Sequence, residues 1–210
     1  MASSSLPQPA RSAQPQPVIA LYGPTASGKT AVAAELRARI DAEVISADSA
    51  ALYAGLPIVT AAPAYPARLV GVVPVTEEVS VGSYQKLAHA AIDDVVAAGR
   101  TAVVVGGTGL YLRAALSALE LPPPPAPGQR ERWEALYAEA GPEAAHALLG
   151  ERDPAAAARV HANDRRRVVR ALELAEAGRS LAPAADRLWT DDTRHPTLLV
   201  ALDLPDDVLE

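Results

Sequence analysis

The sequence predicts an α/β protein with a parallel β-sheet and a helical segment inserted late in the chain. Short apolar runs alternate with stretches of helical periodicity from Val18 to Leu119. This alternation is typical of a parallel sheet that helices cover on both faces. The composition changes at the proline run 122–125, and from there to about Arg194 the chain is charged, rich in alanine and without a convincing strand.

The core elements can be assigned in order along the chain. Val18–Tyr22 is a short apolar run that ends at a glycine, which predicts a buried strand. Ala31–Ile40 places Val32, Leu36 and Ile40 on one helical face. By the same criteria we expect strands at 18–22, 44–47, 69–73, 101–105 and 198–204, and helices at 31–40, 84–96 and 110–119. The last strand returns to the sheet, so residues 18–121 and 195–210 form the predicted core and 122–194 the helical insert.

Composition excludes several classes of protein. The 210 residues contain no cysteine, which rules out disulfides, cysteine nucleophiles and thiolate metal sites. A net charge of -6 argues against a broad polyanion-binding surface, so any nucleic-acid contact must be local. No apolar run approaches the roughly 20 residues that span a bilayer. We therefore expect a soluble, cytoplasmic protein whose residues 1–17, rich in Ser, Pro, Gln and Ala, form a disordered tail; a transit peptide is the weaker alternative.

A phosphate-binding motif follows the first strand. The pattern G-x-x-x-x-G-K-[ST] lies between a predicted strand and a predicted helix, which is the context that it requires. Its glycines let backbone N–H groups turn inward, and the helix that follows adds a partial positive charge of about +0.5. The lysine adds a full charge, and the final threonine offers a hydroxyl to phosphate-bound Mg²⁺. The motif predicts a bound di- or triphosphate through Gly23, Pro24, Thr25, Ala26, Ser27, Gly28, Lys29 and Thr30.

Two further segments end strands at the same predicted edge of the sheet, where α/β proteins bind ligands. Asp48 ends the second strand, where it could cap a turn, act as a general base or hold Mg²⁺ through water. Gly106–Gly109 follows the strand at 101–105, either as a simple turn or with Thr108 as a donor to a leaving oxygen. In the insert, Arg165, Arg166, Arg167 and Arg170 form either a solvated face or a phosphate-contacting patch.

With these pieces, the sequence resembles the tRNA dimethylallyltransferases, also called tRNA isopentenyltransferases. The resemblance runs from about Val18 to Glu210 and rests on separate motifs in the right order. These are 23–30; 45–49 with Leu52, Tyr53 and Gly55; Thr60 with Pro63; 80–85; 105–112; and Asp153-Pro154 followed by Asn163-Asp164, Arg167, Arg170 and 171–173. The resemblance implies a nucleotide-kinase-like P-loop core, related to the P-loop nucleoside triphosphate hydrolases, with an inserted helical subdomain that contacts tRNA.

The resemblance also implies an activity and residue roles. The loop would hold the pyrophosphate of dimethylallyl diphosphate with Mg²⁺, and the dimethylallyl group would pass to the exocyclic amine of the adenine 3′ of the tRNA anticodon. Asp48 matches the base that takes a proton from this amine, and Thr108 matches the group that bonds the bridging oxygen of the leaving pyrophosphate. The tRNA contacts would be Asp48, Ser49, Ala50, Ala51, Thr108, Arg130, Arg166, Arg167, Val168, Val169 and Arg170. We expect a monomer.

Several positions depart from the family pattern. Ala51 stands where Gln is usual, Ala62 where Lys is usual and Gly71 where an acid is usual. The family continues beyond the position of Glu210, so we expect a truncated or short form. Two other functions stay open: a P-loop small-molecule kinase that uses ATP, with Asp48 activating a hydroxyl, and a non-catalytic RNA-binding protein.

Overall fold

The structure, a computed structural model, describes residues 17–182 and 191–205, so the expected tail lies outside these residues apart from Pro17. The described residues belong to two units. The core unit holds residues 17–119 and 191–205, and the helical unit holds 120–182.

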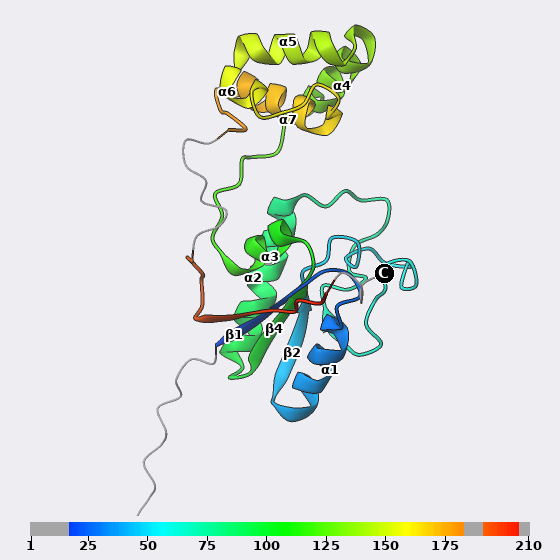
Figure 1. Ribbon diagram of the computed structural model, residues 1–210, viewed down its shortest axis with the longest axis vertical. Coiled ribbons are helices and arrows are strands. Elements are labelled where there is room, and N and C mark those ends of the chain that lie inside the picture. The colour runs from blue at the N-terminus through cyan, green and yellow to red at the C-terminus, as the bar shows by residue number, and fades with distance from the viewer. Residues whose placement is uncertain (1–16, 183–190, 206–210) are drawn as a thin grey trace, which may run out of the picture. The chain divides into compact units, whose positions relative to one another are not determined.

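The core unit is built on one parallel sheet, as predicted (Figure 1), and the sheet has five strands. Its order is β3-β2-β4-β1-β5, and each pair of neighbours is parallel. The strands are β1 (Val18–Tyr22), β2 (Ala42–Ser46), β3 (Ala67–Arg68), β4 (Thr101–Gly106) and β5 (Thr197–Ala201). Because all strands run the same way, the loops after β1, β2 and β4 leave at one edge of the sheet.

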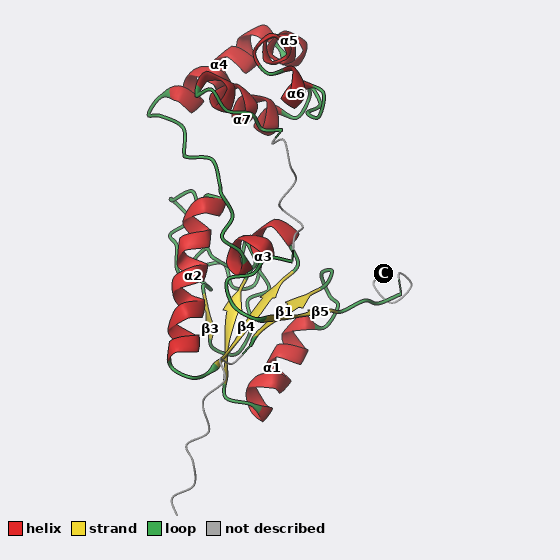
Figure 2. Ribbon diagram, turned by 90° about the vertical axis from the view of Figure 1, so that its left-hand side faces the viewer, coloured by secondary structure: helices red, strands yellow, loops and turns green. Residues whose placement is uncertain are grey.

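Helices cover both faces of this sheet (Figure 2). α1 (Lys29–Arg39) lies on one face, and α2 (Val81–Ala97) and α3 (Gly109–Leu116) lie on the other. Side chains alternate along a strand, so β4 contributes to two apolar clusters. Val104 packs with the α2 and α3 side chains, whereas Val103 packs with the α1 side chains. The β-branched strand therefore joins both layers of the core.

The helical unit contains α4 (Gln129–Ala140), α5 (Pro142–Arg152), α6 (Pro154–Ala157) and α7 (Arg165–Glu176), and its described residues form no strand. Its apolar cluster is built from Trp133, Leu149, Val168 and Leu172, among others. Asp153 begins α6 by accepting a hydrogen bond from the Ala156 N–H at 3.0 Å. No helix among the described residues of either unit combines the length and apolarity needed to cross a bilayer.

One predicted strand is wrong. Residues 69–73 form no strand, because β3 ends at Arg68 and Leu69 has a φ of 61° that turns the chain out of the extended conformation. The apolar run instead packs beside the turn after β2, where the Val72 N–H donates to the Leu52 carbonyl at 2.8 Å. Val73 makes only an isolated bridge, to Tyr53. The other predicted elements are present, with ends shifted by a few residues.

Candidate active site

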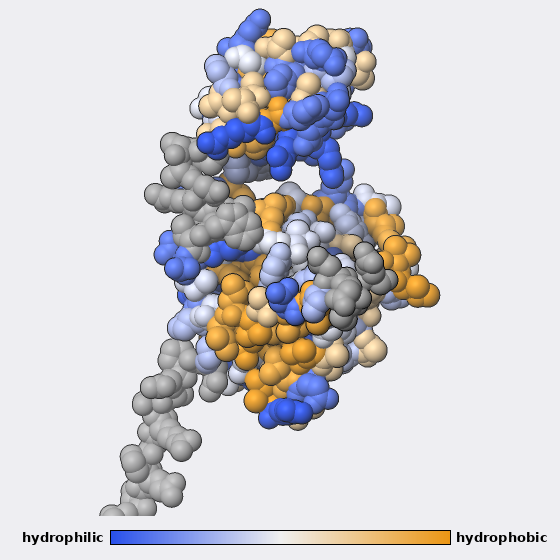
Figure 3. Space-filling model, in the orientation of Figure 1, coloured by the Kyte–Doolittle hydropathy of each residue, from blue (hydrophilic) through white to orange (hydrophobic). Residues whose placement is uncertain are grey.

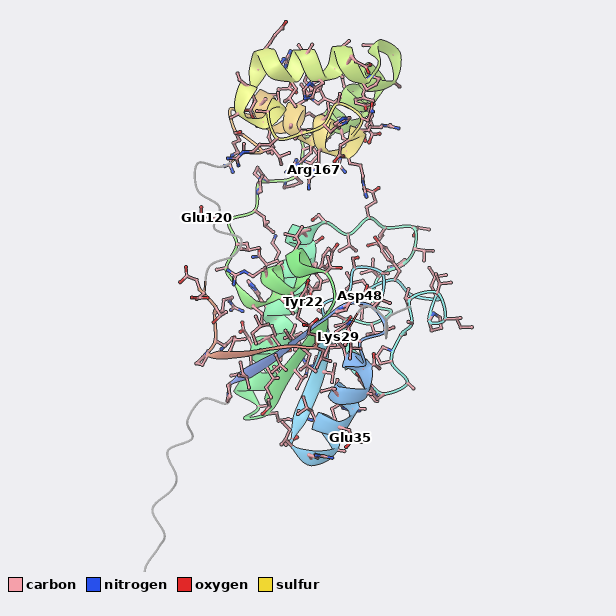
Figure 4. The ribbon with its side chains drawn as sticks, in the orientation of Figure 1. Tyr22, Lys29, Glu35, Asp48, Glu120 and Arg167 are labelled. Atoms are coloured by element: carbon pink, nitrogen blue, oxygen red, sulfur yellow. The ribbon has the colours of Figure 1, made fainter. Side chains whose placement is uncertain are left out.

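Three loops meet where β1, β2 and β4 end, and glycines permit these loops to approach each other closely. A Cβ added at Gly106 would lie 2.5 Å from the Ala47 carbonyl oxygen, so the chain after β4 packs directly on the chain after β2. A Cβ at Gly107 would lie 3.2 Å from the Gly23 carbonyl oxygen and 3.8 Å from Lys29 Nζ. The phosphate loop, the Asp48 turn and the Thr108 loop are therefore neighbours. Figure 4 shows Lys29 and Asp48 at this end of the sheet.

The side chain of Lys29 folds back over its own loop. Its Nζ donates to the carbonyl oxygens of Gly23 at 2.8 Å and Pro24 at 2.5 Å, and it lies 3.5 Å from Ser27 Oγ. Burial lowers the pKa of Lys29, and the charge of Asp48 acts in the opposite direction. The first N–H groups of α1, which begins at Lys29, have no partner within the helix. Together these donors form a cradle for an anion.

Asp48 is held in place by its own turn. Its Oδ1 accepts the N–H groups of Ala50 at 2.8 Å and Ala51 at 3.4 Å, and its backbone N–H donates to Ser46 Oγ at 3.3 Å. No partner for Oδ2 is recorded in the part of the chain that the structure describes. Asp48 is therefore a turn cap, and the same carboxylate keeps one oxygen that can accept a proton.

Two threonine hydroxyls lie at the beginnings of the helices that follow the loops. Thr30 is exposed in the first turn of α1, and Thr108 is exposed at the N-cap of α3, where its side chain caps nothing. The described residues contain no group of three His, Cys, Asp or Glu side chains that could hold a metal ion. The donor set fits Mg²⁺ only as an ion held by phosphate oxygens and water, with the exposed Thr30 offering a hydroxyl.

Residues expected to contact tRNA fall into two sets in the helical unit. Arg166 and Arg167 are exposed on α7. Val168 and Val169 are 0% and 3% exposed and pack in the apolar cluster, so their side chains do not face solvent. In the core unit, Ala50 is exposed and Ser49 is half-buried in the Asp48 turn, while Ala51 is buried at 4% exposure.

Arg130 and Arg170 are engaged inside the helical unit. Both bind Glu173, a carboxylate with a side chain only 1% exposed: Arg130 Nε lies 3.0 Å from one oxygen and Arg170 Nη1 lies 2.8 Å from the other. Arg170 Nη2 also donates to the Pro123 carbonyl oxygen at 2.8 Å. Arg170 therefore joins α7 to the proline-rich segment, a structural role that the sequence analysis missed together with Glu173.

The sequence analysis also missed two groups beneath Asp48. Ser46 accepts the Asp48 N–H through its side chain, and the fully buried Tyr84 donates its hydroxyl to the Ser46 carbonyl oxygen at 3.1 Å. A tyrosine on the apolar face of an amphipathic helix was the available signal, because a buried phenol needs an acceptor.

Comparison with known proteins adds a family match. A family model described as IPP transferase matches residues 51–210. The tRNA dimethylallyltransferase of Salinispora tropica is 47% identical over 165 residues, which cover 76% of this chain and 51% of that protein. The tRNA dimethylallyltransferase of Anaeromyxobacter dehalogenans is 42% identical over 194 residues, which cover 90% of this chain and 65% of that protein.

Solved structures give the same result. The full-length tRNA isopentenylpyrophosphate transferase of Bacillus halodurans is 33% identical with a TM-score of 0.56, over 92% of this chain and 62% of that one. A eukaryotic dimethylallyltransferase acting on tRNA is 27% identical with a TM-score of 0.70, over 89% of this chain and 48% of that one. The chain thus spans between about half and two thirds of the length of these relatives.

Proposed function

Because the chain belongs to the IPP transferase family, we propose that it transfers a dimethylallyl group from dimethylallyl diphosphate to tRNA. The acceptor is the exocyclic amine of the adenine 3′ of the anticodon, and pyrophosphate is the second product. The observation that carries this proposal is the meeting of an anion cradle at Lys29 with a fixed carboxylate at Asp48 on adjacent loops.

The phosphate loop, residues 23–30, would bind the diphosphate. Lys29 would exchange its carbonyl partners for phosphate oxygens, and the N–H groups at the beginning of α1 would bond the same anion. Mg²⁺, when bound through the phosphates with Thr30 nearby, supplies further positive charge to the leaving group. Preorganised donors of this kind stabilise charge that develops in the transition state.

The transfer exchanges one bond to carbon for another. The allylic carbon–oxygen bond breaks and its electron pair leaves with pyrophosphate, to whose bridging oxygen Thr108 donates. The amine nitrogen bonds the same carbon and passes a proton to Oδ2 of Asp48. Because an exocyclic amine is a poor nucleophile, removal of this proton as the bond forms is the task of a general base.

The RNA would be held by exposed cations of the helical unit. Arg166 and Arg167 are exposed and suited to phosphate contacts. Arg130 and Arg170 are paired with the buried Glu173, so their first role would be to hold the helical unit together. The target adenine must leave its stack to reach Asp48, with Ser49 and Ala50 at the entrance. The reaction would take place in the cytoplasm, and the protein would act as a monomer.

The test combines wild-type protein, Mg²⁺, radiolabelled dimethylallyl diphosphate and unmodified tRNA, with label counted in the RNA and ATP turnover measured in parallel. We expect label in the RNA and no ATP turnover. ATP turnover without label would instead indicate the small-molecule kinase, and RNA binding with neither activity would indicate a non-catalytic RNA-binding protein.

The residue roles have a sharper test. Asp48→Asn keeps a side-chain oxygen for the Ala50 and Ala51 N–H groups but removes the base, so the turn should persist while transfer falls at least about a hundredfold. Thr108→Ala should also lower the rate, because the leaving oxygen loses its donor. Near-normal rates in both variants would refute these assignments.

A further inference from the structure

Among the described residues, the pairing of β2 with β3 ends before the carbonyl of Ser46. The Ala47 N–H donates to the Val105 carbonyl at 2.7 Å, so Ala47 faces β4. Successive residues of a strand bond to opposite sides, and the Ser46 carbonyl therefore faces the side of β3. The pairing of β3 reaches only Ile45 with Arg68, after which Leu69 turns away with a φ of 61°.

Tyr84 of α2 takes the place of the missing strand. Its hydroxyl donates to the Ser46 carbonyl oxygen at 3.1 Å from a side chain that is 0% exposed. The ring of Tyr111 packs against it with ring centroids 4.7 Å apart, so the position of the hydroxyl is fixed by packing. Burial, with smaller effects of Tyr111 and Asp48, raises the pKa of Tyr84, so the phenol stays protonated and remains a donor.

Only one hydrogen bond separates this anchor from Asp48. Ser46 accepts the Tyr84 hydroxyl on its backbone and the Asp48 N–H on its side chain, and Asp48 in turn accepts the Ala50 and Ala51 N–H groups. The charge of Asp48 is close enough to affect the pKa of Tyr84. The Asp48 turn is thus linked through Ser46, the last residue of β2, to the Tyr84 hydroxyl of α2.

We propose that Tyr84 is a positioning residue for Asp48: its hydroxyl fixes the end of β2 and thereby the carboxylate that accepts the proton. This inference rests on the proposed transferase function. Misplacement of a reacting group by about 1 Å costs up to about a hundredfold in rate, so loss of this anchor should act on the chemical step and not on substrate binding.

The test compares Tyr84→Phe with Tyr137→Phe. Tyr137 is the matched control, because its hydroxyl also donates to a backbone carbonyl, that of Ala162 at 2.7 Å, but within the helical unit. We expect Tyr84→Phe to lower kcat about tenfold, with KM for both substrates within about twofold of wild type. Tyr137→Phe should leave kcat unchanged.

A second measurement does not depend on activity. Amide hydrogen exchange followed by NMR should be faster at Ala50 and Ala51 in Tyr84→Phe and unchanged there in Tyr137→Phe. If wild-type protein transfers no label, the proposed function fails, and this exchange measurement alone decides whether Tyr84 orders the Asp48 turn.

The outcomes that overturn the proposal are distinct. Unchanged kcat with unchanged exchange at Ala50 and Ala51 would show that the hydroxyl positions nothing, and equal losses of kcat in both variants would show a general effect on stability. If Tyr84→Phe does not fold, Ser46→Ala is the second variant, because it removes only the acceptor of the Asp48 N–H. It should also lower kcat at unchanged KM; a wild-type kcat would contradict the proposal.

Discussion

The ammonium of Lys29 is bonded to its own loop. It donates to two carbonyl oxygens of its own loop, and burial lowers its pKa. A bound diphosphate would replace these carbonyls with charged oxygens and raise that pKa again. Anion binding and protonation of Lys29 are therefore linked, and the affinity depends on pH.

This linkage predicts an alkaline loss of pyrophosphate affinity. The affinity should be constant near neutral pH and fall as pH rises through the pKa of Lys29 in the free protein, which lies below the ordinary lysine value. Isothermal titration calorimetry between about pH 7 and pH 10 would measure it. Lys29→Arg is the control, because its guanidinium stays protonated throughout and shares any titration of the ligand. An identical profile in both proteins would contradict the linkage.

A second prediction concerns Gly106. Gly106→Ala would put a methyl group 2.5 Å from the Ala47 carbonyl oxygen, so the ends of β2 and β4 must move apart. We expect a loss of about 1–3 kcal/mol in the free energy of unfolding, measured by urea denaturation.

Gly150→Ala is the matched control for this change. Gly150 lies within α5, and a Cβ there would meet the Ala157 Cβ at an ordinary 3.9 Å. The substitution should be neutral or stabilise the protein by up to about 1 kcal/mol, because alanine favours a helix. A loss of stability as large as that of Gly106→Ala would remove the steric explanation.

At Asp48 the sequence could not decide between a turn cap and a general base, because both roles require a short carboxylate at the same position. In the structure the two carboxylate oxygens differ. Oδ1 accepts the hydrogen bonds of the turn, whereas Oδ2 has no partner among the described residues. Its assignment as the base stays a prediction. The place of the motif at 23–30 between β1 and α1 could be predicted from its fixed spacing, whereas its binding of a diphosphate stays a prediction.

Among the secondary-structure elements, α7 carries arginines of two kinds. Arg170 is 23% exposed and binds buried Glu173, whereas Arg167 is 67% exposed and lies 3.6 Å from Asp164. Removal of Arg170 leaves Glu173 with only part of its compensation, and an undercompensated buried charge is costly. The arginine run is therefore both a structural element and a candidate RNA surface.

This difference predicts that alanine substitution lowers stability at Arg170 and tRNA affinity at Arg167. Arg170→Ala should lower the free energy of unfolding by about 2 kcal/mol, and Arg167→Ala should change it by less than about 0.5 kcal/mol. Arg167→Ala should instead weaken tRNA binding and reduce the dependence of log K on log salt by about one. Urea denaturation and fluorescence anisotropy would measure the two effects. Equal destabilisation by both substitutions would contradict the division.

Most elements could be predicted from their apolar residues, which recur with a helical period in α2 and form a continuous β-branched run in β4. The strand expected at 69–73 failed because an apolar run does not reveal φ, and Leu69 and Gly71 both have positive values, of 61° and 63°. Val168 and Val169 were expected to contact tRNA because the family resemblance covers the whole stretch 166–170; their side chains form the core face of α7. The pairing of Arg130 and Arg170 with Glu173 is a tertiary contact that sequence spacing does not encode.

For the whole molecule, net charge limits how RNA can be bound. The chain carries -6, so attraction to RNA must come from a local group of cations rather than from the overall field. With the exposed Arg166 and Arg167 as the phosphate contacts, the slope of log K against log salt should lie between about -1 and -2. Anisotropy titrations at fixed Mg²⁺ would give this slope. A value steeper than about -5 would show that cations beyond these arginines contact the RNA.

The two edge strands of the sheet, β3 and β5, differ in how readily a strand of another polypeptide could pair with them. Figure 3 shows the hydropathy of one face of the molecule, and Leu198 and Leu199 of β5 are 55% and 61% exposed. β5 is an edge strand of five residues, whereas β3, at the other edge, has only two and is followed by the turn at Leu69. Very short edge strands protect against unwanted pairing between chains. The same shortness that leaves the Ser46 carbonyl to Tyr84 therefore blunts that edge against aggregation, and a strand added to this sheet would add beside β5.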